Sequence, residues 1–453
     1  MNRSEWINKQ NKKHSSQYTH IDHRISLNHC CGHIFSPTKV ASHGFYPFIH
    51  YTIKQRKYKK DPKTRDIYYA AHIDSWIYRY YAYLINEQYN KIIREKGIQS
   101  APIAYRTDLG KNNIHFAKKA FDFLLKAKSA FIIVGDFSHF FDELDHKYLK
   151  NQIIKLFNFD SKLPPDYYAV FKNLTKYSFV ELSDLLEINK LRPDRIGVRH
   201  FNKSTNFKTA LPDQKLNDFK HLIKRPVEFK GIPQGSPISA ALANVYMLDA
   251  DKKLFDFICK DLNGLYMRYS DDFIAIIPMN DNLKEITRIK DFIIRTLLDI
   301  PNLKLEESKT KCYFFENNNI KRIFNDDSSR KSVVIDFLGF SFNGSSVKIR
   351  EKTITKFYTK LYRKARTIIQ KKGYVNGKHI SRKELYRLYS YKGSFGYQAR
   401  LARRKGLHLG ISSVQGNFID YVAKSQQIFN DQNIKNATKN HMQKIRKALR
   451  NIP

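Results

Sequence analysis

The clearest hydrophobic pattern in the chain is a pair of short apolar runs that flank two adjacent acids. The runs lie within residues 266–277, are rich in Ile, Phe and Tyr, and are bounded by a glycine and a proline. This pattern predicts a β-hairpin with Ser270 and Asp271 in its turn. Ionised carboxylates are costly to bury unless a positive group pairs with them or binds them. A hairpin that carries Asp271 and Asp272 at its tip is therefore a candidate site for a divalent metal ion.

Periodic apolar positions predict further elements on both sides of this hairpin. A spacing of three to four residues indicates helices, and short continuous apolar runs indicate strands. Helices are expected at 64–97, 114–126, 240–247 and 283–298, strands at 131–136 and within 303–315, and a second hairpin at 333–342. Residues 137–146 are expected to turn into a short helix. Residues 160–228, which prolines interrupt, are interpreted as an insertion of loops and short helices, and Lys203 to Lys224 as a stretch that can face nucleic acid.

The predicted strand at 131–136 ends in a third acid, Asp136. An aspartate in this place can cap a following helix or ligate a metal, and the strand alone leaves both open. If the strand and the hairpin are neighbours in one sheet, Asp136 converges with Asp271 and Asp272. Three carboxylates can hold two Mg²⁺ ions that clamp an in-line phosphoryl displacement. Mg²⁺ fits because carboxylates are hard oxygen ligands, and Mn²⁺ is an alternative.

Two glycine-containing loops are candidates for substrate contact. Residues 230–239 hold two glycines and two prolines and precede an alanine-rich helical run. Glycine lets a substrate approach the backbone closely, so we favour a substrate-contacting loop over a plain structured turn. Residues 104–113 form a basic loop before another helix, where backbone amides and a cation can meet a phosphate. Loops before helices are common, so this second signal is weak by itself.

Composition points to an acidic polymer as partner. The 453 residues, enough for two or three domains, contain 81 Lys and Arg against 42 Asp and Glu, a formal charge of +39. Nucleic acid is the first choice of partner. No membrane partner is expected, because no apolar run approaches the length of a spanning helix. Without a signal-peptide core or a disulfide framework, the expected location is cytoplasmic.

The positive charge is concentrated at the C-terminal end. Residues 346–453 contain 26 Lys and Arg and only four acids. Apolar stripes persist at helical spacing, so this segment is expected to be a folded basic helical bundle rather than a disordered tail. Such a face suits a nucleic-acid backbone. Cys30, Cys31, His33 and His43 are interpreted as ordinary loop residues, because their spacing matches none of the common zinc patterns.

Taken together, these motifs resemble the reverse transcriptases. The motifs that carry the resemblance occur in the family's order: Tyr105-Arg106, Asp136 with Phe141 five residues later, Gly231-Ile232-Pro233-Gln234-Gly235-Ser236-Pro237, Tyr269-Ser270-Asp271-Asp272, Ser308-Lys309-Thr310 and Phe337-Leu338-Gly339-Phe340. The resemblance implies an α+β right-hand polymerase with fingers, a palm built on an antiparallel sheet, and a helical thumb. Its expected domains are an N-terminal basic extension at 1–63, fingers at 64–130, a palm at 131–345 with a fingers insertion at about 160–228, and a thumb at 346–453.

The resemblance also implies a role for each matching residue. Asp136 and Asp271 would ligate metal with the backbone carbonyl of Phe137, and Asp272 would be a weaker ligand. The expected nucleotide-contacting residues are Arg106 and Lys111 for the triphosphate, Phe141 against the ribose, and Gln234 and Gly235 in the nucleotide and template loop. Lys309 would protonate the leaving pyrophosphate. The Phe337–Phe340 hairpin would hold the primer terminus. An aromatic Phe141 would exclude a 2′-hydroxyl, which favours DNA synthesis over RNA synthesis.

Among reverse transcriptases, the chain looks most like the compact bacterial enzymes. They include retron and group II intron relatives and, as the best match, the defence-associated enzymes that act against phage. The expected function is RNA-directed DNA synthesis from dNTPs on an RNA template. In the defence-associated group this template can be a structured non-coding RNA. Assemblies of several protomers also occur in that group. Two alternatives stay open: template-independent or protein-primed DNA synthesis by the same palm, and a catalytically inactive RNA-binding scaffold.

Overall fold

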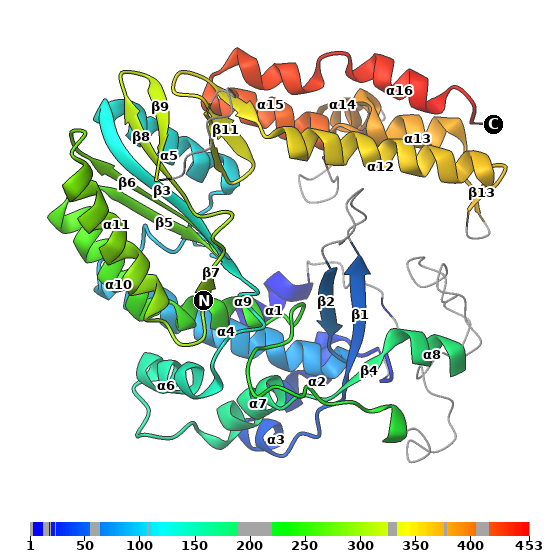
Figure 1. The fold of residues 1–453 in the computed structure, drawn as a ribbon. Coiled ribbons are helices and arrows are strands. Elements are labelled where there is room, and N and C mark those ends of the chain that lie inside the picture. Colours follow the sequence, from blue (N-terminus) through cyan, green and yellow to red (C-terminus); the bar gives the residue numbers. More distant parts are fainter. Residues whose placement is uncertain are drawn as a thin grey trace.

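The computed structural model describes residues 3–11, 18, 20–22, 24–54, 64–106, 108–188, 220–324, 333–375, 378–404 and 416–452. The architecture is α+β and has three parts, with the palm between the fingers and the thumb (Figure 1). Residues 189–219 of the 160–228 insertion, and with them most of the Lys203 to Lys224 stretch, lie outside the described residues. No described helix is long and apolar enough to cross a membrane.

The palm is built on an antiparallel sheet with the strand order β5-β6-β3-β8-β9 and with β7 beside β3. The strands are β3 (Ser129–Ser138), β5 (Leu265–Tyr269), β6 (Asp272–Pro278), β7 (Lys304–Leu305), β8 (Lys311–Glu316) and β9 (Asn319–Ile323). The predicted hairpin is confirmed as β5 and β6, and the strand that ends in Asp136 is its direct neighbour. In the register of β3 and β6, Asp136 lies opposite Asp272.

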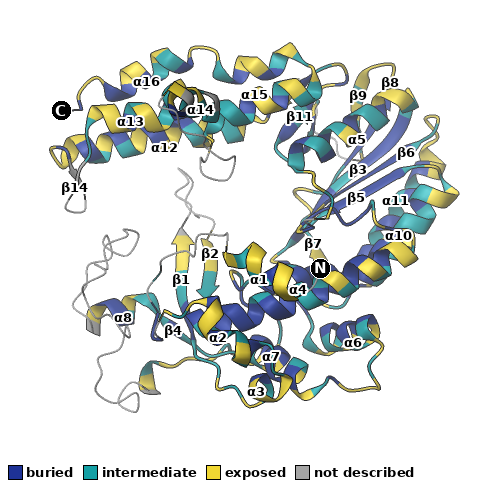
Figure 2. Ribbon diagram, turned by 180° about the vertical axis from the view of Figure 1, so that it is seen from behind, coloured by how far each residue is buried: buried dark blue, intermediate teal, exposed yellow. Residues whose placement is uncertain are grey.

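Helices cover both faces of this sheet, and alternate residues of each strand enter two different cores. Phe131 and Ile133 join the core under α9, α10 and α11, whereas Ile132 joins the core under α5. The sheet is accordingly buried along most of its length (Figure 2). The covering helices are α5 (Asn113–Ala127), α9 (Ser239–Tyr246), α10 (Leu248–Phe255), the π-helix η3 (Asp256–Asp261) and α11 (Leu283–Leu298). The helices predicted at 114–126, 240–247 and 283–298 are confirmed.

The fingers combine a small sheet, ordered β2-β1-β4, with a group of helices. These elements are α1 (Arg3–Asn11), α2 (Leu27–Ile34), α3 (Pro37–Ala41), β1 (Phe48–Lys54), β2 (Thr64–Tyr69), α4 (His72–Glu95), α6 (His146–Phe157), α7 (Pro165–Thr175), β4 (Phe179–Glu181), α8 (Leu182–Ile188) and the 3₁₀ turn η2 (Lys220–Leu222). Trp6 and Leu27 enter the core beneath α4. The predicted boundary at residue 63 thus falls between two paired strands, and the described N-terminal residues pack as part of the fingers.

Two local predictions are wrong. The helix expected over 64–97 begins only at His72, because Thr64–Tyr69 pairs with β1 as a strand. The short helix expected at 137–146 is also not formed. Strand β3 continues to Ser138, and the next helix, α6, begins at His146, where the carboxylate of Asp145 caps it by accepting from Tyr148 N–H at 2.7 Å.

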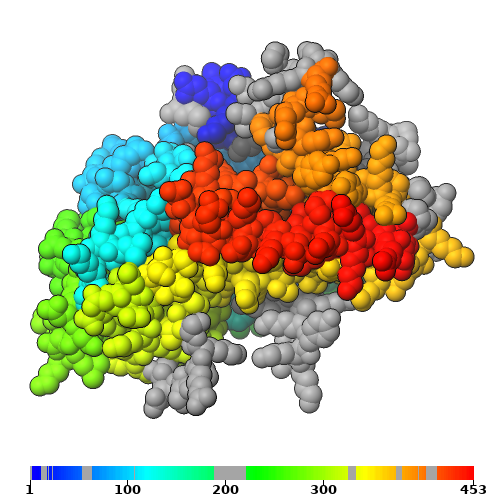
Figure 3. Space-filling view, turned by 90° about the horizontal axis from the view of Figure 1, so that it is seen from above, coloured from blue at the N-terminus to red at the C-terminus, as the bar shows by residue number. Residues whose placement is uncertain are grey.

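The last part of the chain starts with a small three-stranded sheet, whose first two strands fall within the range predicted for the palm, and continues as the helical bundle of the thumb. Its elements are β10 (Ile335–Phe337), β11 (Phe340–Phe342), β12 (Val347–Ile349), α12 (Glu351–Gln370), β13 (Tyr374–Val375), β14 (Lys378–His379), α13 (Arg382–Tyr389), η4 (Tyr391–Gly393), α14 (Phe395–Arg404), α15 (Phe418–Phe429), η5 (Gln432–Thr438) and α16 (His441–Leu449). Helices α12, α13 and α16 share an apolar core. From above, the red helices α15 and α16 run across the outer face of the thumb (Figure 3).

Candidate active site

The turn between β5 and β6 is held by contacts on both sides. Ser270 has a φ of +61°, so the two-residue turn has a positive φ at its first position, as in type II′ hairpin turns. The hydroxyl of Tyr105 donates to Ser270 Oγ at 3.1 Å. On the other side, Phe137 N–H donates to the carbonyl of Asp271 at 3.3 Å. The tip of the hairpin is therefore fastened both to β3 and to the loop before α5.

Asp136 reaches this tip because the residue before it has no side chain. Gly135 lies opposite Phe273, and a Cβ on Gly135 would come within 2.4 Å of the Phe273 ring. The glycine thus lets the two strands pack closely just before the acid. Asp136 is buried, and the described part of the protein donates no hydrogen bond to its Oδ1 atom. One carboxylate oxygen of Asp136 is therefore buried without a hydrogen-bond donor among the described residues.

The three carboxylates repel one another. Burial, followed by the nearby carboxylate of Asp136, raises the pKa of Asp271. The pKa of Asp272 is raised to about 7. The largest cause is desolvation of its carboxyl group by surrounding protein atoms, although the residue as a whole is exposed, and the negative charges of Asp271 and Asp136 add to it. Like charges held this close favour the protonated form. Asp136, Asp271 and Asp272 therefore share one small region, as predicted from the sequence.

Two cations flank the acids. Lys309 Nζ forms an ion pair with Asp136 Oδ2, and the turn that carries Lys309 is fixed to β3 by Glu306 N–H, which donates to the carbonyl of Asp136 at 2.8 Å. Arg350, at the start of the thumb, pairs through Nε with Asp336 at 2.9 Å. Both Lys309 and Arg350 act to lower the pKa of Asp272. The sequence motifs identified Lys309 but gave no indication of Arg350, which lies far along the chain.

A buried ion-pair network below the turn was not foreseen from the sequence. Arg268 is completely buried and donates to Asp251 through Nε at 2.9 Å and Nη2 at 2.7 Å. Nη1 of Arg268 donates to the carbonyl of Ser270 at 2.9 Å, and Nη2 also contacts Asn244 Oδ1 at 3.3 Å. Burial alone would lower the pKa of Arg268, but Asp251 outweighs it and raises that pKa. Asn244 in turn donates to the carbonyl of Ala104 at 3.0 Å. The network joins the β5–β6 turn, α9, α10 and the fingers loop.

The loop at 230–239 lies against the segment that carries Phe141. Ile232 N–H donates to the carbonyl of Phe141 at 2.9 Å. Gly231 has a φ of +78°, and a Cβ there would approach the Asp142 carbonyl oxygen to 2.5 Å. Phe141 is half-buried and packs edge-on against Phe140, with 5.5 Å between ring centroids. The structure therefore brings the predicted ribose-facing ring and the predicted nucleotide loop together.

The same loop also contacts the fingers. Tyr68 N–H, on β2, donates to the carbonyl of Gln234 at 2.8 Å. Gln234 is half-buried and Gly235 is exposed. Phe137, by contrast, directs its side chain into the core, so only its backbone is available for the metal role implied by the family resemblance.

The described contacts of Arg106 and Lys111 lie within and beside their own loop. The Arg106 side chain is 1% exposed and donates to the carbonyls of Gln99 and Pro102 and to Asp108, with Nη2 at 2.7 Å from Asp108 Oδ2. These contacts favour a role in fastening its own loop over the predicted triphosphate contact. Lys111 is exposed and lies near His115 and Lys119 at the beginning of α5, since its charge lowers the pKa of both.

The donor set at the tip fits a divalent cation. Among the described residues, no group of three His, Cys, Asp or Glu side chains is arranged to hold a metal ion. Two observations nonetheless fit Mg²⁺ or Mn²⁺: the donors are all carboxylate oxygens, and Asp136 Oδ1 is a buried acceptor without a donor in the described part of the chain. A cation would also relieve the repulsion that raises the pKa of Asp271 and Asp272.

Comparison with known families agrees with this site. Residues 196–342 match the sequence profile of the family described as "Reverse transcriptase (RNA-dependent DNA polymerase)". The match covers less than half of the chain, includes the loop at 230–239, the β5–β6 turn and Lys309, and begins after Asp136. Residues 196–342 are therefore similar to a reverse transcriptase domain, and the mixed architecture with its antiparallel sheet is consistent with a right-hand polymerase fold. The description of that family names an RNA-dependent DNA polymerase, which is a nucleotidyltransferase.

Several solved structures are similar in fold. Apo telomerase from Candida tropicalis lacking its C-terminal domain is 14% identical, with 68% of this chain and 55% of that chain covered and a TM-score of 0.43. Telomerase from Candida albicans with a fragment of telomeric RNA is 13% identical over 98% and 67% of the two chains, with a TM-score of 0.40. Apo telomerase from C. tropicalis is 17% identical over 89% and 59%, with a TM-score of 0.42. The chain spans 55–67% of the length of these proteins. No curated protein sequence matches it.

Proposed function

We propose that this chain is an RNA-directed DNA polymerase that adds dNTPs to a 3′-hydroxyl with the help of two Mg²⁺ ions. The observation that carries the proposal is the convergence of Asp136, Asp271 and Asp272, from segments far apart in sequence, beside Lys309. The family match over residues 196–342 supports the same reaction. Mn²⁺ would be able to replace Mg²⁺ because the donors are the same.

Each side chain at the tip has a proposed task. Asp136 and Asp271 would hold the cations together with the backbone carbonyl of Phe137, and Asp272 would be the weaker ligand. When bound, the ions would supply Lewis-acid activation and charge neutralisation. Lys309 would donate a proton to the leaving pyrophosphate, and its ion pair with Asp136 is consistent with that position.

The neighbouring loop would select and place the nucleotide. Gln234 and Gly235 would line the nucleotide and template site, and Phe141 would lie against the ribose and exclude a 2′-hydroxyl. The hydrogen bond from Ile232 to the carbonyl of Phe141 supports this arrangement, since it keeps the ring beside the loop. Lys111 remains a proposed triphosphate contact. Arg106 would have to leave its bonds to Asp108 and to two carbonyls to act there.

Primer extension tests the proposal. Purified wild-type protein should incorporate dNTPs on a primed RNA template, and the Asp271→Asn/Asp272→Asn variant should not. Equal incorporation by both proteins would contradict the assignment, and no incorporation by either would favour the RNA-binding scaffold. Sequencing the product separates the remaining alternative, because a templated product must complement the RNA whereas an untemplated or protein-primed product need not.

For the biological setting we propose bacterial defence against phage. The template would be a structured non-coding RNA. The enzyme would act in the cytoplasm, as a monomer or in an oligomer. The support is the sequence resemblance to the defence-associated enzymes and the formal charge of +39. Cells that carry the wild-type gene should resist phage, and cells with Asp271→Asn should not. Equal phage sensitivity of the two strains, with polymerase activity intact in vitro, would remove the defence role and leave the reaction in place.

A further inference from the structure

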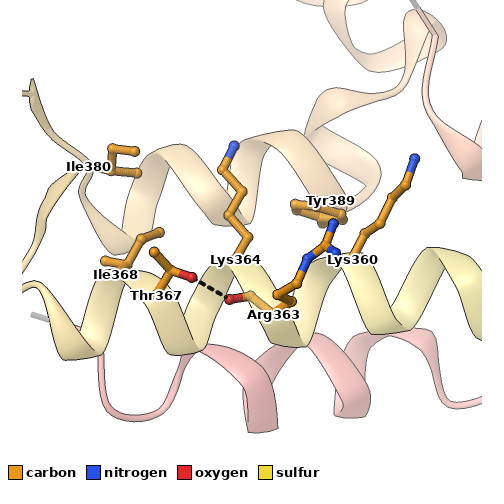
Figure 4. Close-up of a pocket in the computed structure, with 7 residues that line it drawn as sticks. All are labelled: Lys360, Arg363, Lys364, Thr367, Ile368, Ile380 and Tyr389. Atoms are coloured by element: carbon orange, nitrogen blue, oxygen red, sulfur yellow. Dashed lines mark hydrogen bonds between the residues drawn. The ribbon is translucent and has the colours of Figure 1, made fainter. Parts of the chain in front are cut away.

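The thumb contains a pocket that is separate from the carboxylate site. Its volume is about 330 Å³, and it lies between α12 and the segment that includes α13 (Figure 4). The residues that line it are Lys360, Arg363, Lys364, Thr367, Ile368, Ile380 and Tyr389. This volume is at the lower end of the range for small-molecule sites, so the pocket has room for one group about the size of a nucleotide.

One wall of the pocket is strongly positive. Lys360, Arg363 and Lys364 are three and four residues apart on α12, so they share one face of the helix. None of the three forms an ion pair with an acid among the described residues. Figure 4 shows all three extending away from the C-terminal helix, drawn in faint red on the opposite side of α12. An anionic group is the ligand that this wall favours.

The other wall is apolar and aromatic. Ile368 is buried, and Ile380 and Tyr389 are half-buried. The backbone of Tyr389 is fixed by His441 Nε2 at 3.0 Å from its carbonyl, and its ring packs against Phe357 with 5.5 Å between centroids. In Figure 4 the ring of Tyr389 lies near Arg363, and Ile368 and Ile380 lie at the other end of the pocket. The ring offers a stacking surface, which phosphate alone would not use.

We propose that this pocket binds one unpaired nucleotide of a single-stranded nucleic acid, with the base against Tyr389 and the phosphate beside Arg363 and Lys364. A fully paired duplex presents phosphates to a basic face but keeps its bases stacked inside, so it cannot use the apolar wall. The pocket opens on the side of the thumb away from α16, which is the side turned toward the fingers (Figure 1). The inference goes beyond the proposed polymerisation and does not require it.

The first test compares single-stranded with paired RNA. The affinities of the full-length Asp271→Asn protein for a fluorescent single-stranded RNA and for a duplex of the same length are measured by anisotropy, which removes catalysis from the readout. Tyr389→Leu should weaken single-strand binding about tenfold, the size expected for one stacked base, and should leave duplex binding unchanged. Tyr389→Phe keeps the ring and should bind as the parent does. Unchanged single-strand binding by Tyr389→Leu, or an equal loss for both ligands, would overturn the proposal.

The second test measures the phosphate contacts. For single strands, each lost phosphate contact reduces the slope of log affinity against log salt by about 0.7. Arg363 and Lys364 are proposed to face the same phosphate, so Arg363→Gln/Lys364→Gln should reduce the slope for single-stranded RNA by about 0.7. Arg366→Gln is the matched control, because Arg366 is exposed on the same helix but does not line the pocket. An equal change per residue in the control and in the double variant would contradict a specific site.

Discussion

Two groups of charges meet at the β5–β6 hairpin, and each combines residues of the hairpin with a residue of a neighbouring element. Below the turn, Arg268 and Asp251 are both fully buried and bonded to each other through two nitrogens of the guanidinium. At the tip, Asp136, Asp271 and Asp272 crowd together, and the pKa of Asp272 rises to about 7. The lower group is neutralised by the protein itself, whereas the upper group retains mutual repulsion.

The difference shows which charges support the fold and which are held for a ligand. A buried ion pair is tolerated only when its remaining donors and acceptors are satisfied, and Arg268 meets this condition through Ser270 and Asn244. The carboxylates at the tip do not meet it, because Asp136 Oδ1 accepts no hydrogen bond from the described residues. We interpret the tip as a region where stability is given up so that a cation can bind.

The largest expected effect separates activity from stability at the tip. Asp271→Asn should lower polymerase activity by at least about 10³-fold, because it removes a proposed metal ligand. Its melting temperature without divalent ions should not fall, since the substitution relieves repulsion from Asp136. Primer extension and thermal unfolding on the same preparation provide the check. A variant that loses activity only because it unfolds would break the comparison.

The next effect concerns the network below the turn. Arg268→Met should cost about 3–5 kcal/mol of unfolding free energy, because it leaves Asp251 buried without its partner. Chemical denaturation measures this cost. The double variant Arg268→Met/Asp251→Leu should recover much of the stability and stay poorly active, since the carbonyl of Ser270 still lacks its donor. A single variant as stable as wild type would show that the network does not support the fold.

The smallest expected effect is on sugar selection. Phe141→Ala should raise the use of ribonucleotides relative to deoxynucleotides by roughly tenfold or more, because a space opens where the ring is proposed to meet the 2′-hydroxyl. Competition between labelled dNTPs and rNTPs on one template measures the ratio, and retained dNTP incorporation is the internal control. An unchanged ratio would refute the role of Phe141 and leave the assignment of the carboxylates intact.

The sequence predicted the carboxylates at the tip of the hairpin but not the Arg268–Asp251 network below it. The reason is that the network joins residues whose contact no local sequence pattern indicates. The hairpin, β3 and α11 follow from local periodicity, and Asp136 lies at a strand end that the pattern marks. Arg268 has no local signal, because its partner Asp251 and its acceptor at Ser270 meet only in the folded chain. The strand at 64–69 was missed for the same reason, because its pairing with β1 overrides a sequence that also fits a helix.

Arg106 has a local partner that is an alternative to a phosphate ligand. A cation in a loop before a helix suggests phosphate binding. Asp108, however, lies two residues later, and its Oδ2 accepts a hydrogen bond from Arg106 Nη2 at 2.7 Å. An acid close in the sequence can thus compete with a phosphate ligand for an arginine.

The most direct test of the account is the binding of a divalent cation at the tip. Mn²⁺, titrated into the protein and followed by electron paramagnetic resonance, should bind wild type and should bind Arg268→Met/Asp251→Leu more weakly but at the same site. The Asp136→Asn/Asp271→Asn variant, folded as judged by thermal unfolding, should lose this binding. Mn²⁺ binding of equal affinity and stoichiometry in wild type and in Asp136→Asn/Asp271→Asn would contradict the assignment of these carboxylates as the metal site.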